Sequence, residues 1–216
     1  MKIKTTTFPN YGTIETQLSS ETIKIFWKLI DEAKNNPVNM NSILAGQISS
    51  SLRLNMNSPE LKDFGQQTIP KLVNTYIETF KSLPIKYNNA DRVGLTLELQ
   101  DLWVNFQKEH EFNPIHDHNG AFSFVIWMKI PTSSQEQNAS VICSNSGTKG
   151  LISNFSFVYT DILGNIGNYV YAMEKNIEGY MVMFPSRLNH QVFPFYDNQN
   201  TRVSISGNLG VVKKII

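Results

Sequence analysis

The hydrophobic pattern of this 216-residue chain changes its period near residue 92, and this change constrains the fold more than any other feature. Before it, apolar residues recur every three to four positions, as on the buried face of an amphipathic helix. Beyond it, Leu95, Leu97 and Leu99 alternate with polar residues, which indicates a strand with one buried face. We therefore expect a helical part in residues 1–91 and a β core in residues 92–216.

Two amphipathic helices are predicted in the first part. The first carries an apolar stripe over residues 23–33, preceded by a serine that can cap it, Ser19 or Ser20. The second begins at Ser58-Pro59-Glu60, where a capping residue, a proline in the first turn and an acid follow one another. Pro70 should break or kink this second helix, because proline lacks the backbone donor and clashes with the preceding turn.

Short strands separated by turn residues fill the second part. The segment at residues 39–55 is ambiguous and fits a short helix followed by a strand. Many short strands predict a sandwich or barrel of jelly-roll type. The expected fold class is therefore α+β and mainly β, a single domain over residues 1–216 whose N-terminal helices pack outside the barrel. After the strand at residues 95–99, candidate strands lie at about residues 102–108, 121–130, 138–143, 154–161, 168–175, 179–184, 188–194 and 201–209.

Three of the four histidines fit one metal site. His116 and His118 stand two positions apart in "FNPIHDHNG", so a strand would point both imidazoles to one side and Asp117 to the other. His190, in "FPSRLNHQV", lies at the expected start of a later strand and can add a third imidazole. Three such ligands occupy one face of a metal ion and leave positions open for substrate and oxygen. Because imidazole suits iron, zinc, copper and nickel alike, these residues do not by themselves select the metal.

The final strand, "TRVSISGNL", has one polar and one apolar face. Arg202, Ser204, Ser206 and Asn208 share the polar face, and the ordinary interpretation is that this face meets solvent. The alternative places Arg202 and Ser204 inside the barrel, where the planar guanidinium could donate two parallel hydrogen bonds to a carboxylate. The twelve positions from His190 to Arg202 suffice for the chain to finish one strand, turn and return alongside it.

Composition excludes several classes of partner. With 19 basic and 18 acidic residues and a net charge of +1, the chain carries no electrostatic footprint for nucleic acid or an anionic membrane. Its one cysteine excludes an intrachain disulfide and fits a reducing compartment. No run reaches transmembrane length, and the opening residues lack the apolar stretch of a signal peptide. We expect a soluble cytoplasmic protein that acts on a small-molecule or peptide substrate, and its helices either brace the barrel or help to form a homodimer.

These motifs, in this order, resemble a known family. The stretches "LWVNFQKEHEFNPIHDHNGAFSFVIWM", "GYMVMFPSRLNHQVFPF" and "TRVSISGNL" are similar to those of 2-oxoglutarate/Fe(II)-dependent oxygenases of the double-stranded β-helix fold. The likeness is greatest to a small family found in marine bacteria and their phages, and it covers Trp103 to Asn208, about half of the chain. It implies a dioxygenase that uses Fe(II) and 2-oxoglutarate, most simply a hydroxylase, which would act in the host cytoplasm if a phage encodes it.

The resemblance also implies which residues hold the metal. Fe(II) would be bound by His116, His118 and His190. The commonest pattern in this superfamily is instead His-x-Asp with a distal His, so the neutral His118 stands where a carboxylate is usual. A carboxylate would lower the charge of the bound metal, and its lack could weaken iron retention or favour another metal. An irregular backbone could bring Asp117 inward in place of His118, but regular alternation favours His118.

The same resemblance assigns the co-substrate contacts. Arg202 would hold the distal carboxylate of 2-oxoglutarate, and Ser204 would complete an R-x-S pair. Asn105, two residues after Trp103 on the preceding strand, would be a further contact with the co-substrate.

Two other functions remain open from the sequence. A cupin-type metalloenzyme that does not use 2-oxoglutarate would share the barrel and the H-x-H motif. Against it, Arg187 stands where the second cupin motif has glycine, the usual acidic ligand is missing, and cupins do not require an Arg202–Ser204 pair. The second alternative is a non-catalytic jelly-roll protein with a structural or binding role, such as a phage component, because one fold hosts many functions.

Overall fold

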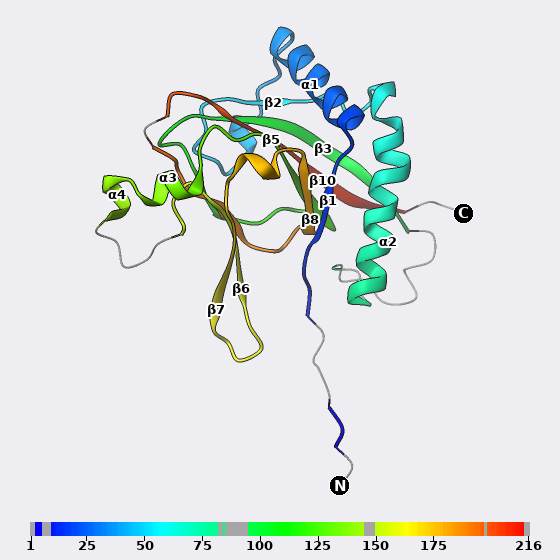
Figure 1. Cartoon of the computed structure of the whole chain (residues 1–216). Coiled ribbons are helices and arrows are strands. Elements are labelled where there is room, and N and C mark those ends of the chain that lie inside the picture. Colours follow the sequence, from blue (N-terminus) through cyan, green and yellow to red (C-terminus); the bar gives the residue numbers. More distant parts are fainter. Residues whose placement is uncertain are drawn as a thin grey trace.

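The chain folds around two antiparallel sheets, seen in a computed structural model that describes residues 3–5, 10–81, 84, 95–144, 150–196 and 198–213 (Figure 1). The larger sheet has the strand order β1-β8-β5-β10-β3-β2, and the smaller one has the order β4-β9-β6-β7. The elements are β1 (Ile14–Gln17), α1 (Ser20–Asn35), β2 (Ser51–Arg53), α2 (Ile69–Phe80), β3 (Leu95–Gln107), β4 (Asn113–His116), β5 (Phe122–Lys129), α3 (Ser134–Asn138), α4 (Val141–Ser144), β6 (Phe155–Thr160), β7 (Ile166–Tyr171), β8 (Tyr180–Pro185), β9 (His190–Val192) and β10 (Arg202–Lys213).

This arrangement confirms the predicted double-stranded β-helix with helices outside it. Strand β10 runs through the larger sheet, paired with β3 along one edge and with β5 along the other. In the smaller sheet, β9 lies between β4 and β6, with His116 opposite His190. Figure 1 shows α1 and α2 beside the barrel and the β6–β7 hairpin extending away from it.

One expected contact is wrong: the chain does not return from His190 to run alongside its own strand. Strand β9 belongs to the smaller sheet and β10 to the larger one. The connection crosses between the sheets and is fixed there by the buried Phe195, whose carbonyl accepts a hydrogen bond from the backbone N–H of His110 at 2.9 Å. His190 and Arg202 therefore belong to opposite sheets.

Helix α1 forms where its apolar stripe and its cap predict. The Ser19 side chain accepts a hydrogen bond from the backbone N–H of Thr22 at 3.1 Å, which satisfies one of the free donors at the helix start. Its apolar face contacts the outer face of the larger sheet through Phe64, whose ring lies 5.1 Å from Phe26 and 5.8 Å from Phe124, between ring centroids. The helix residues buried in this core are Phe26, Leu29, Ile30 and Ala33.

The second helical segment is interrupted, as Pro70 predicts. A 3₁₀ turn (Pro59–Leu61) and a π-helical turn (Phe64–Thr68) precede α2, and Pro70 lies in the first turn of α2, where its missing N–H costs nothing. The ambiguous segment at 39–55 contains a short 3₁₀ helix (Asn41–Ile43) and then β2, as expected.

The strand predicted at residues 138–143 is wrong, because this region forms the short helices α3 and α4. The side chain of Glu174 accepts hydrogen bonds from the backbone N–H groups of Ser134 at 2.7 Å and of Gln135 at 3.4 Å, and so caps the start of α3. Strand β1 was not anticipated; its four residues extend the larger sheet by pairing with β8.

None of the helices in the described ranges combines the length and the apolar character needed to cross a membrane.

We propose that helices and barrel fold as one domain, and a core substitution tests this. Phe26 is fully buried between α1 and the larger sheet, so Phe26→Ala should lower the free energy of unfolding by about 3–5 kcal/mol. The exposed Lys24 of the same helix provides the control, and Lys24→Ala should change it by less than about 0.5 kcal/mol. Urea unfolding followed by both far-UV circular dichroism and tryptophan fluorescence should give one coincident transition. Two separate transitions, with only the first shifted by Phe26→Ala, would contradict the proposal.

Candidate active site

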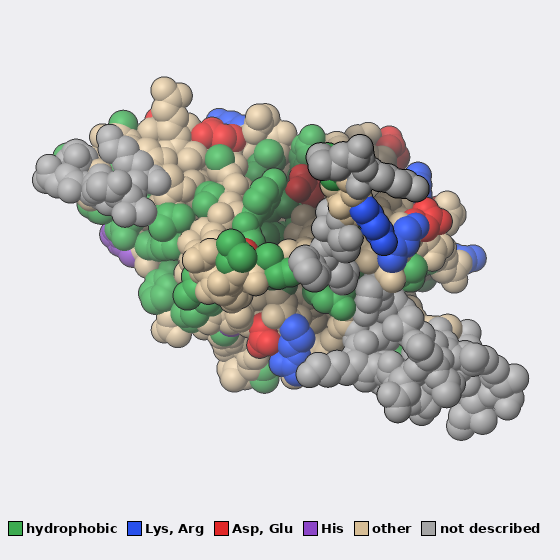
Figure 2. Space-filling view, turned by 90° about the horizontal axis from the view of Figure 1, so that it is seen from below, with side chains coloured by type: hydrophobic (Ala, Val, Ile, Leu, Met, Phe, Trp, Pro, Cys, Tyr) green, Lys and Arg blue, Asp and Glu red, His purple; other side chains and the backbone are tan. Residues whose placement is uncertain are grey.

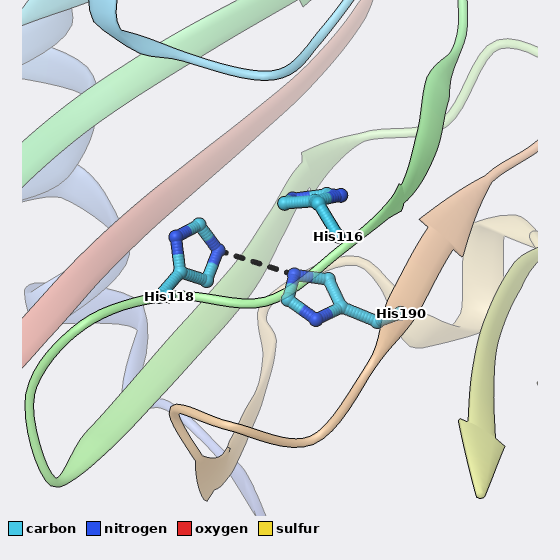
Figure 3. A group of neighbouring side chains, drawn as sticks. All are labelled: His116, His118 and His190. Atoms are coloured by element: carbon cyan, nitrogen blue, oxygen red, sulfur yellow. Dashed lines mark hydrogen bonds between the residues drawn. The ribbon is translucent and has the colours of Figure 1, made fainter.

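Three histidines from the smaller sheet and its adjoining loop lie together inside the barrel (Figure 3). His116 ends β4, His118 follows in the loop after it, and His190 begins β9. One ring nitrogen from each lies within 4.8 Å of the others, and the Nε2 atoms of His118 and His190 are 3.1 Å apart. Two nitrogens that bind one metal ion at a right angle, each at about 2.1 Å, lie about 3 Å apart. The cluster therefore fits a single metal ion.

Backbone carbonyls fix the orientation of two of these rings. The Nδ1 atom of His116 lies 2.7 Å from the carbonyl oxygen of Pro114, and the Nδ1 atom of His190 lies 2.9 Å from that of Leu188. A carbonyl can only accept, so each Nδ1 carries the proton and each Nε2 keeps its lone pair. This is the arrangement that a metal-binding histidine requires.

Burial keeps the three imidazoles uncharged. It lowers the pKa of His118 to about 4, assisted by repulsion from His116. It also lowers the pKa of His116, and it holds the pKa of His190 well below the ordinary value, with further repulsion from the other two rings. Neutral imidazoles are the form that binds a metal, so the site is ready to accept one at neutral pH.

Asp117 lies outside this cluster. Its carboxylate accepts a hydrogen bond from the guanidinium of Arg187 at 3.1 Å, and both side chains are exposed. His118 is turned inward instead, with its ring centroid 5.9 Å from that of Trp103. The backbone N–H of His118 donates to the carbonyl of Ser186 at 2.8 Å, which ties this loop to the turn that precedes His190.

A glycine shapes the loop that carries His118. Gly120 has φ +103°, a conformation that side chains rarely adopt, and an added Cβ would come within 2.8 Å of the carbonyl oxygen of Leu209. The same oxygen accepts a hydrogen bond from the backbone N–H of Ala121 at 2.8 Å. Only glycine meets both requirements, so the loop can enter β5 directly after the histidine pair.

An irregularity in β4 turns a second polar side chain toward the cluster. Asn113 pairs with Val192 and His116 with His190, so β4 has one extra residue over this interval. A bulge of this kind shifts the alternation by one position, and both Asn113 and His116 line the interior. A regular strand would have turned them to opposite faces.

The histidines form one wall of a cavity of about 60 Å³, and the inward face of β10 forms the opposite wall. The interpretation that this polar face meets solvent is therefore wrong. The apolar face of the same strand, with Val203, Ile205 and Leu209, is buried against the helix-covered core. Residues 41, 44–46 and 48 also line the cavity. The polar residues on or beside the wall opposite the histidines are Ser51, Asn105, Gln107, Arg202, Ser204 and Ser206.

Arg202 is 3% exposed and has no acidic partner among the described residues. Its Nη2 donates to the hydroxyls of Ser153 at 2.6 Å and Thr132 at 3.1 Å, and its Nη1 donates to the side-chain oxygen of Gln107 at 3.4 Å. The ring of Phe195 lies 4.9 Å from the guanidinium carbon. Burial lowers the pKa of Arg202 to about 9, and its Nε has no hydrogen-bond partner within the described part of the chain. A buried cation without a counter-ion is unfavourable, so this arrangement fits an anionic ligand.

Asn105 and Ser204 both line the cavity, but they differ in their contacts. The hydroxyl of Ser51 donates to the side-chain oxygen of Asn105 at 2.7 Å, and the amide of Asn105 donates to the hydroxyl of Ser206 at 3.5 Å. Asn105 is thus held in place by its neighbours. Ser204 is half-buried on the same face of β10 as Arg202.

Sequence analysis missed the residues that surround Arg202: Gln107, Thr132, Ser153 and Phe195. They come from four separate segments, and no local pattern marks them as neighbours of an arginine. His110, the fourth histidine of the chain, is exposed and lies outside the histidine cluster, with its ring 5.1 Å from that of Tyr196.

A comparison with protein families identifies the class. Residues 101–208, half of the chain, match the family model described as Putative 2OG-Fe(II) oxygenase. The chain therefore belongs to the 2OG-Fe(II) oxygenase family, as the motifs predicted. It is an oxygenase that depends on Fe(II) and 2-oxoglutarate, which decides against the cupin-type and non-catalytic alternatives. A search of curated protein sequences finds no match.

Solved structures support the fold. A prolyl-4-hydroxylase from Pseudomonas putida is similar with a TM-score of 0.53 and 13% identity, over 93% of this chain and 92% of that one. A prolyl hydroxylase from Trichoplax adhaerens, bound to a peptide fragment of hypoxia inducible factor, has a TM-score of 0.51 and 13% identity, over 94% and 84%. The epimerase SnoN from nogalamycin biosynthesis has a TM-score of 0.51 and 12% identity, over 91% and 77%. At these identities the likeness concerns the fold alone.

The neutral histidines predict how the metal-free protein responds to acid. The pKa of His118 is about 4 in the fold, against an ordinary value of 6.5, so only the unfolded chain takes up this proton between these values. Stability should be fully present above about pH 6.5 and fall as the pH approaches 4. Urea unfolding of chelator-treated protein at pH 7, 6 and 5 measures this loss. His118→Gln should flatten the pH dependence, and equal slopes for wild type and His118→Gln would contradict the assignment.

Proposed function

We propose that this oxygenase hydroxylates a peptide side chain or a small metabolite at the described cavity. In this proposal His116, His118 and His190 hold Fe(II), and Arg202 binds the distal carboxylate of 2-oxoglutarate. The observation that carries it is the pairing, across one cavity, of three neutral imidazoles with a buried arginine that has no acidic partner among the residues that the structure describes. 2-Oxoglutarate needs both groups: a metal to chelate at one end, and a positive charge to bind the carboxylate at the other.

The assignment of His118 rather than Asp117 as the second ligand rests on where the side chains lie. The ring of His118 is 5.1 Å from that of His116 and 4.9 Å from that of His190, between centroids. Asp117 is engaged with Arg187 at the surface. Exchanging these roles would require breaking that ion pair and turning the loop over, against the backbone bond from His118 to Ser186.

Each of the residues that form the proposed site then has a defined task. Fe(II), held by His116, His118 and His190, would supply the oxidising chemistry: 2-oxoglutarate would lose carbon dioxide and take one atom of O2 to become succinate, and the other oxygen atom would enter the substrate. The carbonyls of Pro114 and Leu188 keep the Nε2 atoms of their histidines directed at the metal position. Arg202 binds and orients the co-substrate through its charge and its Nε donor, which no group in the described ranges accepts. Residues 41, 44–46 and 48 line the cavity and limit the access of water.

Ser204 and Asn105 are proposed as further co-substrate contacts. Ser204 follows Arg202 on the same face of β10, where its hydroxyl can donate to the carboxylate that Arg202 binds. Asn105 lines the space between the arginine and the histidines, and Ser51 and Ser206 hold its amide. Its role would be to position the middle of the co-substrate.

A peptide is the substrate class with more structural support. Apart from the cavity, an open groove of about 1400 Å³ is lined in part by Tyr11, Tyr159 and Tyr169. Leu188, whose carbonyl orients His190, also lines this groove, although none of the three histidines does. Figure 2 shows hydrophobic side chains gathered over the face seen from below, toward which the β6–β7 hairpin extends. Two prolyl hydroxylases are among the similar structures, one of them bound to a peptide fragment.

The remaining partner and location assignments belong to the same proposal. The near-zero net charge supports neither a nucleic-acid nor a membrane partner. Cys143 is free and buried, in keeping with a cytoplasmic protein. A homodimer through the N-terminal helices stays a prediction that sedimentation would test.

Loss of His190 should abolish metal-dependent co-substrate binding. Anaerobic addition of Fe(II) and then 2-oxoglutarate to the wild-type protein should produce the weak visible charge-transfer band of the chelate. His190→Ala removes a ligand whose Nε2 is oriented for the metal, so the band should disappear and turnover of 2-oxoglutarate to succinate should cease. His110→Asn is the control, because asparagine accepts the positive φ of His110, and it should retain both. A full band in His190→Ala would rule out the proposed metal site.

Replacing Arg202 should affect the co-substrate and spare the metal. Arg202→Lys keeps a positive charge but loses the planar fork, so the 2-oxoglutarate concentration for half-saturation should rise about ten- to hundredfold. Iron content after gel filtration should equal that of wild type. Arg187→Lys, a matched change at the exposed ion pair with Asp117, should alter neither quantity. Unchanged half-saturation in Arg202→Lys would show that the carboxylate is held elsewhere.

A further inference from the structure

Ser153 combines a strained backbone with complete burial. Its φ is +66°, in the left-handed region that serine rarely adopts, and its exposure is 0%. It is the third residue of a turn closed by a hydrogen bond from the backbone N–H of Asn154 to the carbonyl of Leu151, at 3.1 Å. Glycine or asparagine is favoured at such a position, because a side chain there is crowded by its own backbone. A serine therefore needs another reason to be present.

Neighbouring segments hold this turn so that it cannot relax. The backbone N–H of Ser153 donates to the carbonyl of Pro194 at 2.9 Å. The buried side chain of Asn154 donates to the carbonyl of Gly150 and the hydroxyl of Ser134, and it accepts from the backbone N–H of Met173 at 2.9 Å. The position of the Ser153 hydroxyl is thus set by the strands and loops around it.

That hydroxyl contacts the arginine of the active site. It accepts a hydrogen bond from Nη2 of Arg202 at 2.6 Å, and Thr132, 2% exposed, accepts a second from the same nitrogen at 3.1 Å. The two hydroxyls also lie 3.1 Å apart, within hydrogen-bonding distance of each other. Since Phe195 contacts the guanidinium from another side, the end of the Arg202 side chain is held by neutral groups that leave its charge available.

We propose that Ser153 is a positioning residue that, together with Thr132, fixes the guanidinium of Arg202 at one depth in the cavity and thereby selects the length of the 2-oxo diacid. This inference rests on the proposed role of Arg202 as the carboxylate anchor. With the histidine cluster at one end and a held guanidinium at the other, the span between the two binding groups is constant. If this span accepts the five-carbon 2-oxoglutarate, as the proposed function requires, a homologue with one more methylene would have to displace the arginine.

Because the backbone of Ser153 is strained, two substitutions can separate the effect of its hydroxyl from the effect of its backbone conformation. Ser153→Gly and Ser153→Ala both remove the hydroxyl, but glycine accepts the positive φ and alanine does not. Ser153→Gly should therefore melt about 2–4 °C higher than Ser153→Ala. In the anaerobic titration, both should raise the half-saturating 2-oxoglutarate concentration about tenfold, the size of one hydrogen bond to a charged group, with unchanged iron content.

Chain-length selection provides a readout that a purely structural role would leave unchanged. The ratio of half-saturating concentrations for 2-oxoadipate, the six-carbon homologue, and 2-oxoglutarate should fall in both Ser153 variants, because a released guanidinium can move outward. Thr132→Val removes the second hydroxyl with little change of shape and should act in the same direction. It keeps the proposal testable if the Ser153 variants do not fold.

The outcomes separate this inference from the proposed function. If Arg202→Lys weakens 2-oxoglutarate binding while the Ser153 and Thr132 variants bind both diacids as wild type does, Arg202 is the anchor and the positioning role is refuted. The role is also refuted if Ser153→Ala weakens binding but Ser153→Gly does not, since backbone conformation would then be the cause. If Arg202→Lys has no effect either, the carboxylate anchor itself is wrong.

Discussion

Strand β10 is constrained on every side, and the active site depends on this. It is hydrogen-bonded to β3 along one edge and to β5 along the other, so its register cannot shift without breaking two ladders. Its apolar face is buried under the N-terminal helices, which commits the opposite face to the barrel interior. Arg202 is therefore held inside despite the cost of burying a charge, and the helices contribute to the site without touching it.

The electrostatic character of the cavity follows from what its walls carry. Three uncharged imidazoles stand on one side, and on the other stands an arginine that has no counter-ion in the described part of the chain. Neutral hydroxyls and an aromatic ring satisfy the geometry of the guanidinium while leaving its charge uncompensated. A carboxylate in the place of Ser153 or Thr132 would have stabilised the empty protein and competed with an anionic ligand. Binding capacity is thus retained at the expense of the stability of the unliganded fold.

Local patterns in the sequence were enough to predict several parts of the fold and of the candidate site. The apolar stripe of α1, the Ser19 cap and the alternation along β10 are properties of short segments, and each was found in the structure. His116 and His118 do lie together, but the strand expected to align them is wrong, because β4 ends at His116 and His118 lies in the loop after it. Longer-range features were not predictable. Whether β9 and β10 pair is decided by competition among distant strands, and the bulge in β4 is visible only in its register with β9. The groups around Arg202 lie 7, 49, 70 and 95 positions away along the chain, where no periodicity relates them.

The lack of a carboxylate in the histidine cluster has a thermodynamic consequence. A divalent ion held only by neutral ligands keeps its full charge, and the nearest fixed charge across the cavity is also positive. Asp117 and Asp101 act on the histidines only from outside the cavity lining. In the proposed site, the dianionic co-substrate would then be the negative charge in contact with both cations. Because coupling between two binding events is reciprocal, metal and 2-oxoglutarate should each tighten the binding of the other. Iron retention in the cell would accordingly follow the supply of the co-substrate.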